Sequence, residues 1–258
     1  MDYPKINLTL LQKLVAGYHW CLELDWMELC GLTIVPGRYI TPDLSVIDID
    51  NIWDYIQTLE GFREPDCLTA RVSLSQTALL SPMISQMSCL TALDLDCVKA
   101  THVQDWLIRT AFTATQLQQL KHVSLNVSGC RVHVAALSHW LQQMPNLHSF
   151  TLVDDSNANW GNGTLIIPPK LTELRQLAIH CHLPTHQLDL GVLPALTRLS
   201  IRCGTSENDS PWFPNLKQMT ALHSITWDNL YTKDLVQLSP HLPLQLEQFT
   251  AKLARWDK

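Results

Sequence analysis

An apolar phrase, apolar-x-x-apolar-x-apolar, recurs about every 25 residues along most of the chain. Alternation of apolar and polar positions within each phrase is typical of a strand with one buried face. A fixed period of this length indicates a solenoid, in which each unit buries its apolar residues only against its neighbours. The complete or nearly complete copies are Leu90/Leu93/Leu95, Leu120/Val123/Leu125, Leu147/Phe150/Leu152, Leu174/Leu177/Ile179, Leu196/Leu199/Ile201, Leu222/Ile225/Trp227 and Leu246/Phe249/Ala251.

Three further copies are predicted nearer the N-terminus. Leu44/Ile47/Ile49 fits the whole phrase, whereas Val72/Leu74 and Leu22/Leu24 fit with the polar residues Thr69 and His19 in the first slot. We therefore expect about ten strands in one parallel sheet.

The phrases resemble the strand segment of leucine-rich repeat proteins, L-x-x-L-x-L followed by Asn or Cys. In this chain the Asn or Cys falls two places after the last apolar residue, one place earlier than in the family pattern: Asn51, Cys97, Cys181, Cys203 and Asn229. The segments that introduce some phrases, such as Met144-Pro145-Asn146-Leu147, are similar to those of irregular intracellular leucine-rich repeat proteins. The resemblance implies an α/β solenoid, a right-handed horseshoe with a parallel concave sheet and helical or extended convex segments.

The segments between phrases vary. Helical spacing of apolar residues predicts helices over 51–63, 102–119 and 131–144 and a short turn of helix over 234–239. Polar, glycine-containing stretches at 154–164 and 204–214 predict loops on the rim. We expect one domain over 1–258, with an N-terminal cap at 1–17, repeats at 18–251 and a C-terminal end at 252–258.

The polar positions of each phrase are predicted to face outward on the concave sheet, where a protein partner would bind. Acidic residues gather in the N-terminal half and basic residues in the C-terminal half, which would orient a partner of opposite polarity. Polar residues there are also what a soluble sheet needs, so both interpretations stay open. The candidate partner-binding residues are Glu23, Asp25, Asp48, Asp50, Arg71, Asp94, Asp96, His122, Asn126, His180, Arg198, Arg202, Asp228 and Lys252.

Two tryptophans, Trp160 and Trp212, lie in the predicted rim loops and are further candidate contacts. The alternative for each is that the indole packs back onto the flank of the solenoid.

Composition narrows the function. The formal net charge is −6, with only 18 dispersed basic residues, which argues against nucleic-acid binding. No apolar run is long enough to span a membrane, and eight cysteines without a secretory signal indicate reduced thiols. We expect an intracellular protein, resident in the cytoplasm or delivered into that of another cell.

Catalytic chemistry finds little support in the sequence. His180, Cys181 and His182 suggest zinc ligands, but adjacent strand residues point to opposite faces, so no metal site is expected. No nucleophile or phosphate-binding motif is present, and no cofactor is expected. The sequence favours a non-catalytic protein-recognition scaffold, an adaptor, substrate-recognition subunit or effector, acting as a monomer or in a hetero-complex. The alternatives are an architectural subunit held permanently in an assembly and, less favoured, a metal-dependent enzyme using the His180/Cys181/His182 cluster.

Overall fold

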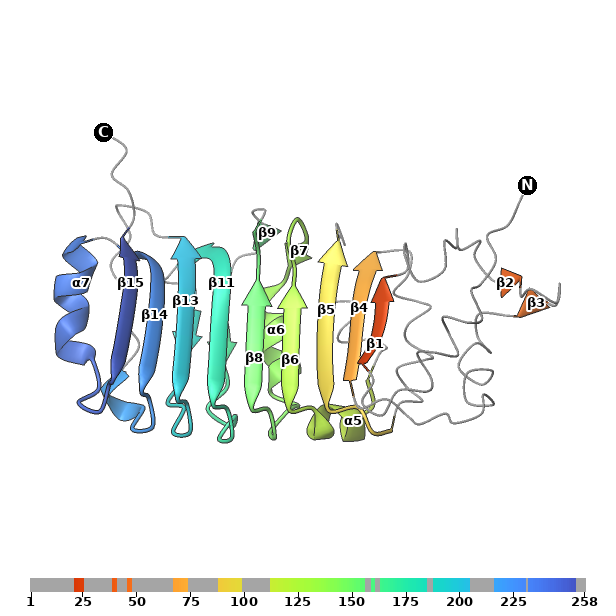
Figure 1. Ribbon diagram of the computed structural model, residues 1–258, viewed down its shortest axis with the longest axis horizontal. Coiled ribbons are helices and arrows are strands. Elements are labelled where there is room, and N and C mark those ends of the chain that lie inside the picture. The colour runs from red at the N-terminus through yellow and green to blue at the C-terminus, as the bar shows by residue number, and fades with distance from the viewer. Residues whose placement is uncertain are drawn as a thin grey trace.

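The computed structural model describes residues 21–25, 39–40, 46–47, 67–73, 88–98, 112–155, 159–160, 163–184, 188–204, 216–230 and 232–253. A nine-stranded sheet runs through most of these segments (Figure 1). Every pair of neighbouring strands in it is parallel, and the strands follow one another in chain order. They are β1 (Cys21–Asp25), β4 (Cys67–Ser73), β5 (Ala92–Val98), β6 (His122–Asn126), β8 (Ser149–Val153), β11 (Gln176–Pro184), β13 (Arg198–Gly204), β14 (Ser224–Leu230) and β15 (Gln248–Leu253). The predicted parallel sheet is thus confirmed for this part of the chain.

The middle apolar residues of the seven complete phrases lie in register across β5 to β15. Each is the Cα partner of the next: Leu93, Val123, Phe150, Leu177, Leu199, Ile225 and Phe249. The first-slot leucines of the phrases Leu90 to Leu222 are fully buried beneath the sheet edge. Burial of one such side chain contributes about 1.5–3 kcal/mol relative to exposure, so the repeated phrase supplies a continuous core.

The predicted register of β4 is wrong by four residues. Leu68, and not Val72, is the Cα partner of Leu93, and Val72 lies opposite Cys97. A slip by an even number of residues keeps the same side chains on the same face, so the alternating pattern cannot distinguish the two registers. The slip moves Arg71 to the position opposite Asp96.

The predicted strand at Leu44/Ile47/Ile49 does not belong to the main sheet. β1 pairs directly with β4, and β3 (Val46–Ile47) pairs antiparallel with β2 (Tyr39–Ile40). The Pro42-Asp43 dipeptide between the two strands is typical of a turn. A nearby antiparallel partner closes a shorter loop than a distant parallel one, which favours local pairing.

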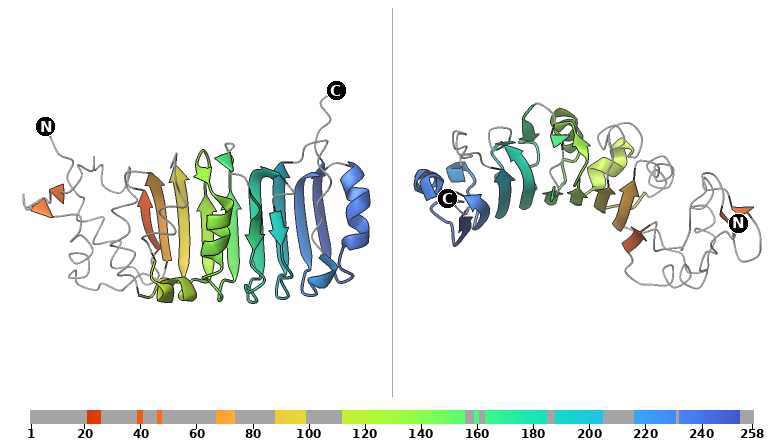
Figure 2. Two further views of the ribbon diagram at one scale, coloured as in Figure 1. Left: turned by 180° about the vertical axis from the view of Figure 1, so that it is seen from behind. Right: turned by 90° about the horizontal axis from the view of Figure 1, so that it is seen from above.

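One face of the main sheet is covered by the connecting segments. α6 (Val134–Leu141) lies over it, as the view from behind shows (Figure 2). α6 packs against β10 (Leu165–Ile167), which pairs in parallel with β12 (Leu188–Leu190). The Ser138 hydroxyl donates to the Val134 carbonyl at 3.0 Å and accepts from the Ile166 N–H at 2.9 Å, which ties helix and strand together.

The helix predictions are confirmed in part. α5 (Ala114–Gln119) lies within the predicted 102–119 helix and begins at a capping box formed by Thr113 and Gln116. α6 is shorter than the predicted 131–144, because Arg131–Val132 form β7, which pairs in parallel with β9 (Asn159–Trp160). The predicted turn of helix over 234–239 corresponds to α7 (Thr232–Leu238), followed by the 3₁₀ turn η4 (Ser239–His241). A second 3₁₀ turn, η3 (Leu216–Gln218), precedes β14. The predicted helix over 51–63 lies outside the described residues.

Candidate functional site

The other face of the main sheet, called the open face below, carries the residues that alternate with the buried apolar ones. From β6 to β15 the described side chains on it are half-buried or exposed, and none is buried. No described helix or strand covers these strands in Figure 1, which looks onto this face. The backbone pairing aligns its residues in three rows that cross all nine strands. The row nearest the C-terminal ends of the strands is Asp25, Arg71, Asp96, Asn126, Val153, His180, Arg202, Asp228 and Lys252.

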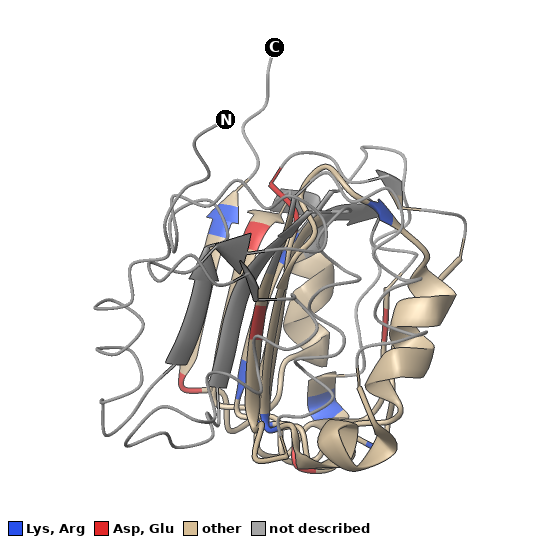
Figure 3. Cartoon of the chain, turned by 90° about the vertical axis from the view of Figure 1, so that its right-hand side faces the viewer, with Lys and Arg blue, Asp and Glu red and all other residues tan. Residues whose placement is uncertain are grey.

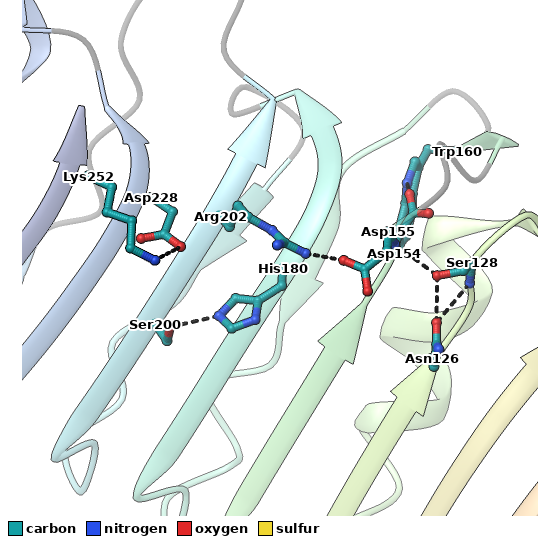
Figure 4. A network of polar contacts seen from close by, with 10 residues as sticks. All are labelled: Asn126, Ser128, Asp154, Asp155, Trp160, His180, Ser200, Arg202, Asp228 and Lys252. Carbon is teal, nitrogen blue, oxygen red and sulfur yellow. Dashed lines mark hydrogen bonds and ion pairs between the residues drawn. The ribbon is translucent and has the colours of Figure 1, made fainter. Parts of the chain in front are cut away.

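A chain of polar contacts follows this row across β6, β8 and β13 (Figure 4). The Arg202 guanidinium forms an ion pair with Asp155, just beyond β8. The Asp155 N–H donates to the Ser128 hydroxyl at 2.8 Å, and that hydroxyl donates to Asn126 Oδ1 at 2.7 Å. Residues from segments far apart in sequence are thereby fixed relative to one another. Two of them, Asn126 and Arg202, are candidates from the sequence.

His180 lies in the same row and contacts the next strand. Its Nε2 is 2.7 Å from the Ser200 hydroxyl. Burial lowers the pKa of His180, with the nearby Arg202 guanidinium acting in the same direction and Asp228 and Asp155 opposing it. The imidazole is therefore mostly neutral at neutral pH. It forms a hydrogen bond with Ser200 and does not add a positive charge to the open face.

The acidic half is interrupted by Arg71, as the sequence already indicates, and the register places this basic position between Asp25 and Asp96 in the row. At the other end, Lys252 Nζ lies 3.3 Å from Asp228 Oδ2, and Arg202 is paired with Asp155. The opposite charges within these two ion pairs compensate locally, which weakens the long-range field that the sequence suggested for the basic half.

The remaining candidates are placed as follows. Asp94, His122 and Arg198 are exposed on the open face. Glu23, Asp25, Arg71 and Asp96 occupy open-face positions by their backbone register. Asp48, Asp50 and Trp212 lie outside the described residues.

Trp160 is partly buried against the core, and its indole N–H donates to Asp154 Oδ2 at 2.9 Å. Asp154 has no exposed surface, and its own N–H donates to the His180 carbonyl at 2.7 Å. Asp154 is not among the candidate residues from the sequence. A signal for it exists, because Asp154 falls two places after Leu152, as Cys97 and Cys181 fall two places after their phrases.

The zinc hypothesis does not gain support from the geometry. Cys181 is buried in the core, whereas His180 lies on the open face, as strand alternation requires. Among the residues described, no group of three or more His, Cys, Asp or Glu side chains is placed to hold a metal ion. The described helices are also too short or too polar to cross a membrane.

Comparison with protein-family models, with curated proteins and with solved structures finds no match for this chain.

Proposed function

We propose that this chain is an irregular leucine-rich repeat protein that recognises a protein partner, without catalysis, through the open face of its sheet. The proposal takes the repeated phrase as the unit of a solenoid and the open face as its concave surface. An intracellular site of action is part of the proposal, supported by the buried thiol of Cys181.

The observation that carries the proposal is a parallel sheet with one uncovered face. Parallel sheets are usually covered on both faces, because their crossover connections pack on each side. Among the described segments, α6 and the β10/β12 pair lie on one face only, and the side chains opposite them from β6 to β15 are mostly polar and are half-buried or exposed. Solenoids use such a surface to bind extended partners.

The polar contacts on this face support recognition of a structured or extended polypeptide. The series of polar contacts from Arg202 to Asn126 holds hydrogen-bond donors and acceptors in fixed positions. Less side-chain entropy is therefore lost when a partner binds. Several of these groups remain accessible, with the Asp155 side chain 63% exposed and that of Arg202 37% exposed.

The test is to obstruct the middle row of the open face. Thr151 and Thr226 lie there on β8 and β14, and the double variant T151R/T226R places two long charged side chains on this surface. The matched control is I166R, because Ile166 is 40% exposed on β10, in the layer behind the sheet. Circular dichroism and thermal unfolding would show that each variant folds.

We expect the wild-type chain to capture a defined partner in near-stoichiometric amount from a lysate of its own cells. The T151R/T226R variant should lose that partner, and I166R should retain it. Retention by T151R/T226R, with loss in I166R, would contradict recognition through the open face.

A second candidate function is architectural, as a permanent subunit of a larger assembly. The C-terminal end favours it, because β15 is the last strand of the sheet and three large apolar side chains are exposed there: Val236 at 72%, Leu244 at 103% and Leu253 at 51%. Exposed apolar groups at one end are typical of a surface that another subunit covers. Gel filtration of the isolated chain distinguishes the two functions: a stable monomer favours recognition, and obligate association favours the architectural role.

A further inference from the structure

The N-terminal ends of the strands are joined by a repeated backbone arrangement. In each step, one carbonyl accepts hydrogen bonds from two consecutive N–H groups of the following phrase. The Lys121 carbonyl, for example, accepts from His148 at 2.7 Å and from Ser149 at 3.0 Å. The same arrangement occurs at the carbonyls of Thr91, Lys121, His148, Arg175, Thr197 and His223. Residues at the start of successive phrases are therefore neighbours along this edge.

This edge is rich in basic side chains. Five of the following six residues are exposed, and His148 is half-buried. We call the set the basic band: Lys121, His122, His148, Arg175, Arg198 and His223. Figure 3 shows Lys and Arg positions, with some Asp or Glu positions among them, at the lower ends of the strands, where the N-terminal ends lie in Figure 1.

The residues between the members of the basic band along the edge are neutral. They are Ser149, Gln176, Thr197 and Ser224. The acidic positions at this edge are Glu173, in the turn before β11, and Glu247, next to His223 at the end of the band. Within the described residues, neither Arg175 nor Arg198 forms an ion pair, in contrast to Arg202 and Lys252. Among the described residues, no salt bridge therefore compensates the charge of these two arginines.

The imidazoles of the band are arranged for further contacts. The rings of His122 and His148 are 6.2 Å apart between centroids and meet edge to face. His223 Nδ1 contacts the Ala221 carbonyl, and because a carbonyl can only accept, Nδ1 carries the proton and Nε2 remains available.

We propose that the basic band binds an extended acidic segment of the partner protein, with its carboxylates on Arg175 and Arg198. This inference rests on the proposed function and names the chemistry of the partner. Strands in a sheet lie about 4.8 Å apart, so the band from β6 to β14 is about 20 Å long, which about six extended residues span. A guanidinium group can donate two parallel hydrogen bonds to one carboxylate. The exposed Arg175 immediately precedes β11, and the exposed Arg198 begins the adjacent β13 and donates its N–H to the Arg175 carbonyl.

An acidic polypeptide suits the band better than a nucleic acid does. Only Lys121, Arg175 and Arg198 are permanently charged in the band, and the chain as a whole carries a formal net charge of −6. Nucleic-acid sites depend on more densely clustered Lys and Arg, and the negative net charge of the protein disfavours nucleic-acid binding further.

Binding should strengthen at mildly acidic pH. Burial lowers the pKa of His122, and the neighbouring His148 and Lys121 lower it further. The other residues that pair with this position are neutral, Ala92 on β5 and Ser149 on β8. A bound carboxylate favours the charged imidazole, so binding takes up protons. Glutamate side chains stay ionised well below the range in which imidazoles become charged.

The probe is a fluorescent peptide of about twelve residues in which Glu alternates with Thr, since Thr favours an extended backbone. Anisotropy at low ionic strength measures its affinity for the wild-type chain and for R175E and R198E. R131E is the matched control, because Arg131 is exposed on β7 at the opposite edge of the sheet (Figure 1). A peptide with Gln in place of Glu and a single-stranded oligonucleotide of similar length are measured in parallel.

We expect saturable binding that R175E and R198E each weaken about tenfold and R131E changes less than about twofold. Affinity should fall with added salt and rise between pH 7.5 and pH 6, and H122Q should reduce that rise. Three results would overturn the proposal: no saturable binding, equal loss in R131E, or tighter binding of the oligonucleotide than of the acidic peptide. If R175E fails to weaken peptide binding while T151R/T226R still abolishes partner capture, the open-face function stands and the basic band does not.

Discussion

The indole N–H of Trp160 donates a 2.9 Å hydrogen bond to Oδ2 of Asp154, a carboxylate with no exposed surface. This contact attaches β9 to the end of β8, beside the polar contacts of the open face (Figure 4). A buried carboxylate is stable only when its oxygens are hydrogen-bonded, so the pair links the stability of the sheet to the conformation of its rim.

Replacing Trp160 with phenylalanine should lower the free energy of unfolding by about 1–3 kcal/mol. The substitution keeps most of the ring packing but removes a donor from a buried carboxylate. Urea unfolding of W160F, D154N and the double variant measures the effect. D154N removes the charge while an amide oxygen can still accept from the indole, so W160F should cost less in the D154N background. Equal costs in both backgrounds would contradict a specific charge-assisted bond.

Phe150 tests whether the sheet shares one continuous core. It is fully buried on β8 between Val123 and Leu177. F150A should lower the free energy of unfolding by about 3–5 kcal/mol, because it removes apolar contacts and leaves a cavity. T151A, one residue later on the open face, should change it by less than about 0.5 kcal/mol. Similar effects of the two substitutions in urea unfolding would refute the assignment of faces.

Gly163 should not tolerate a side chain. Its φ angle is 139°, and a Cβ placed there would lie 2.8 Å from Cγ2 of the buried Val134 at the start of α6. G163A should therefore lower the free energy of unfolding by about 1–3 kcal/mol through strain and displacement of α6.

The double variant G163A/V134A is the control, because truncating Val134 removes the close contact while the backbone strain remains. Thermal unfolding should show G163A to be less destabilising in the V134A background than in the wild type. The same cost in both would mean that close packing against α6 does not restrict this position.

We expect His180 to make the protein less stable at acidic pH. Burial holds its pKa in the folded protein below the ordinary 6.5, so below that pH the unfolded chain binds more protons than the folded chain does at this site. The free energy of unfolding should then fall as the pH drops below about 6.5, and the loss should continue down to the lower pKa of the folded state. H180Q, which does not titrate, should reduce the decline between about pH 7 and about pH 5.

S200A serves as the comparison for His180, because it removes the hydrogen-bond partner but leaves the imidazole. The pH dependence of its thermal unfolding should stay close to that of the wild type. His122, whose pKa is also lowered, accounts for part of the slope that H180Q leaves. A slope in H180Q identical to that of the wild type would exclude His180 as its source.

The sequence alone determined which residues form the buried face and that the strands are parallel. Apolar residues at every second position specify one face of a strand, and the recurrence of Leu93, Val123 and Phe150 in equivalent phrases specifies their pairing in register. The buried leucines that open each phrase follow from the same pattern.

Only the tertiary structure decided which residues are neighbours across strands. The alternation of β4 is unchanged by a slip of two or four positions, so its register, and with it the place of Arg71 between Asp25 and Asp96, depends on backbone pairing. Asp154 and Trp160, like Arg175 and Arg198, are brought together by hydrogen bonds between backbone groups or side chains of different segments. A period along the chain specifies faces, whereas the contacts of the candidate surface depend on residues that become adjacent only when the strands pair.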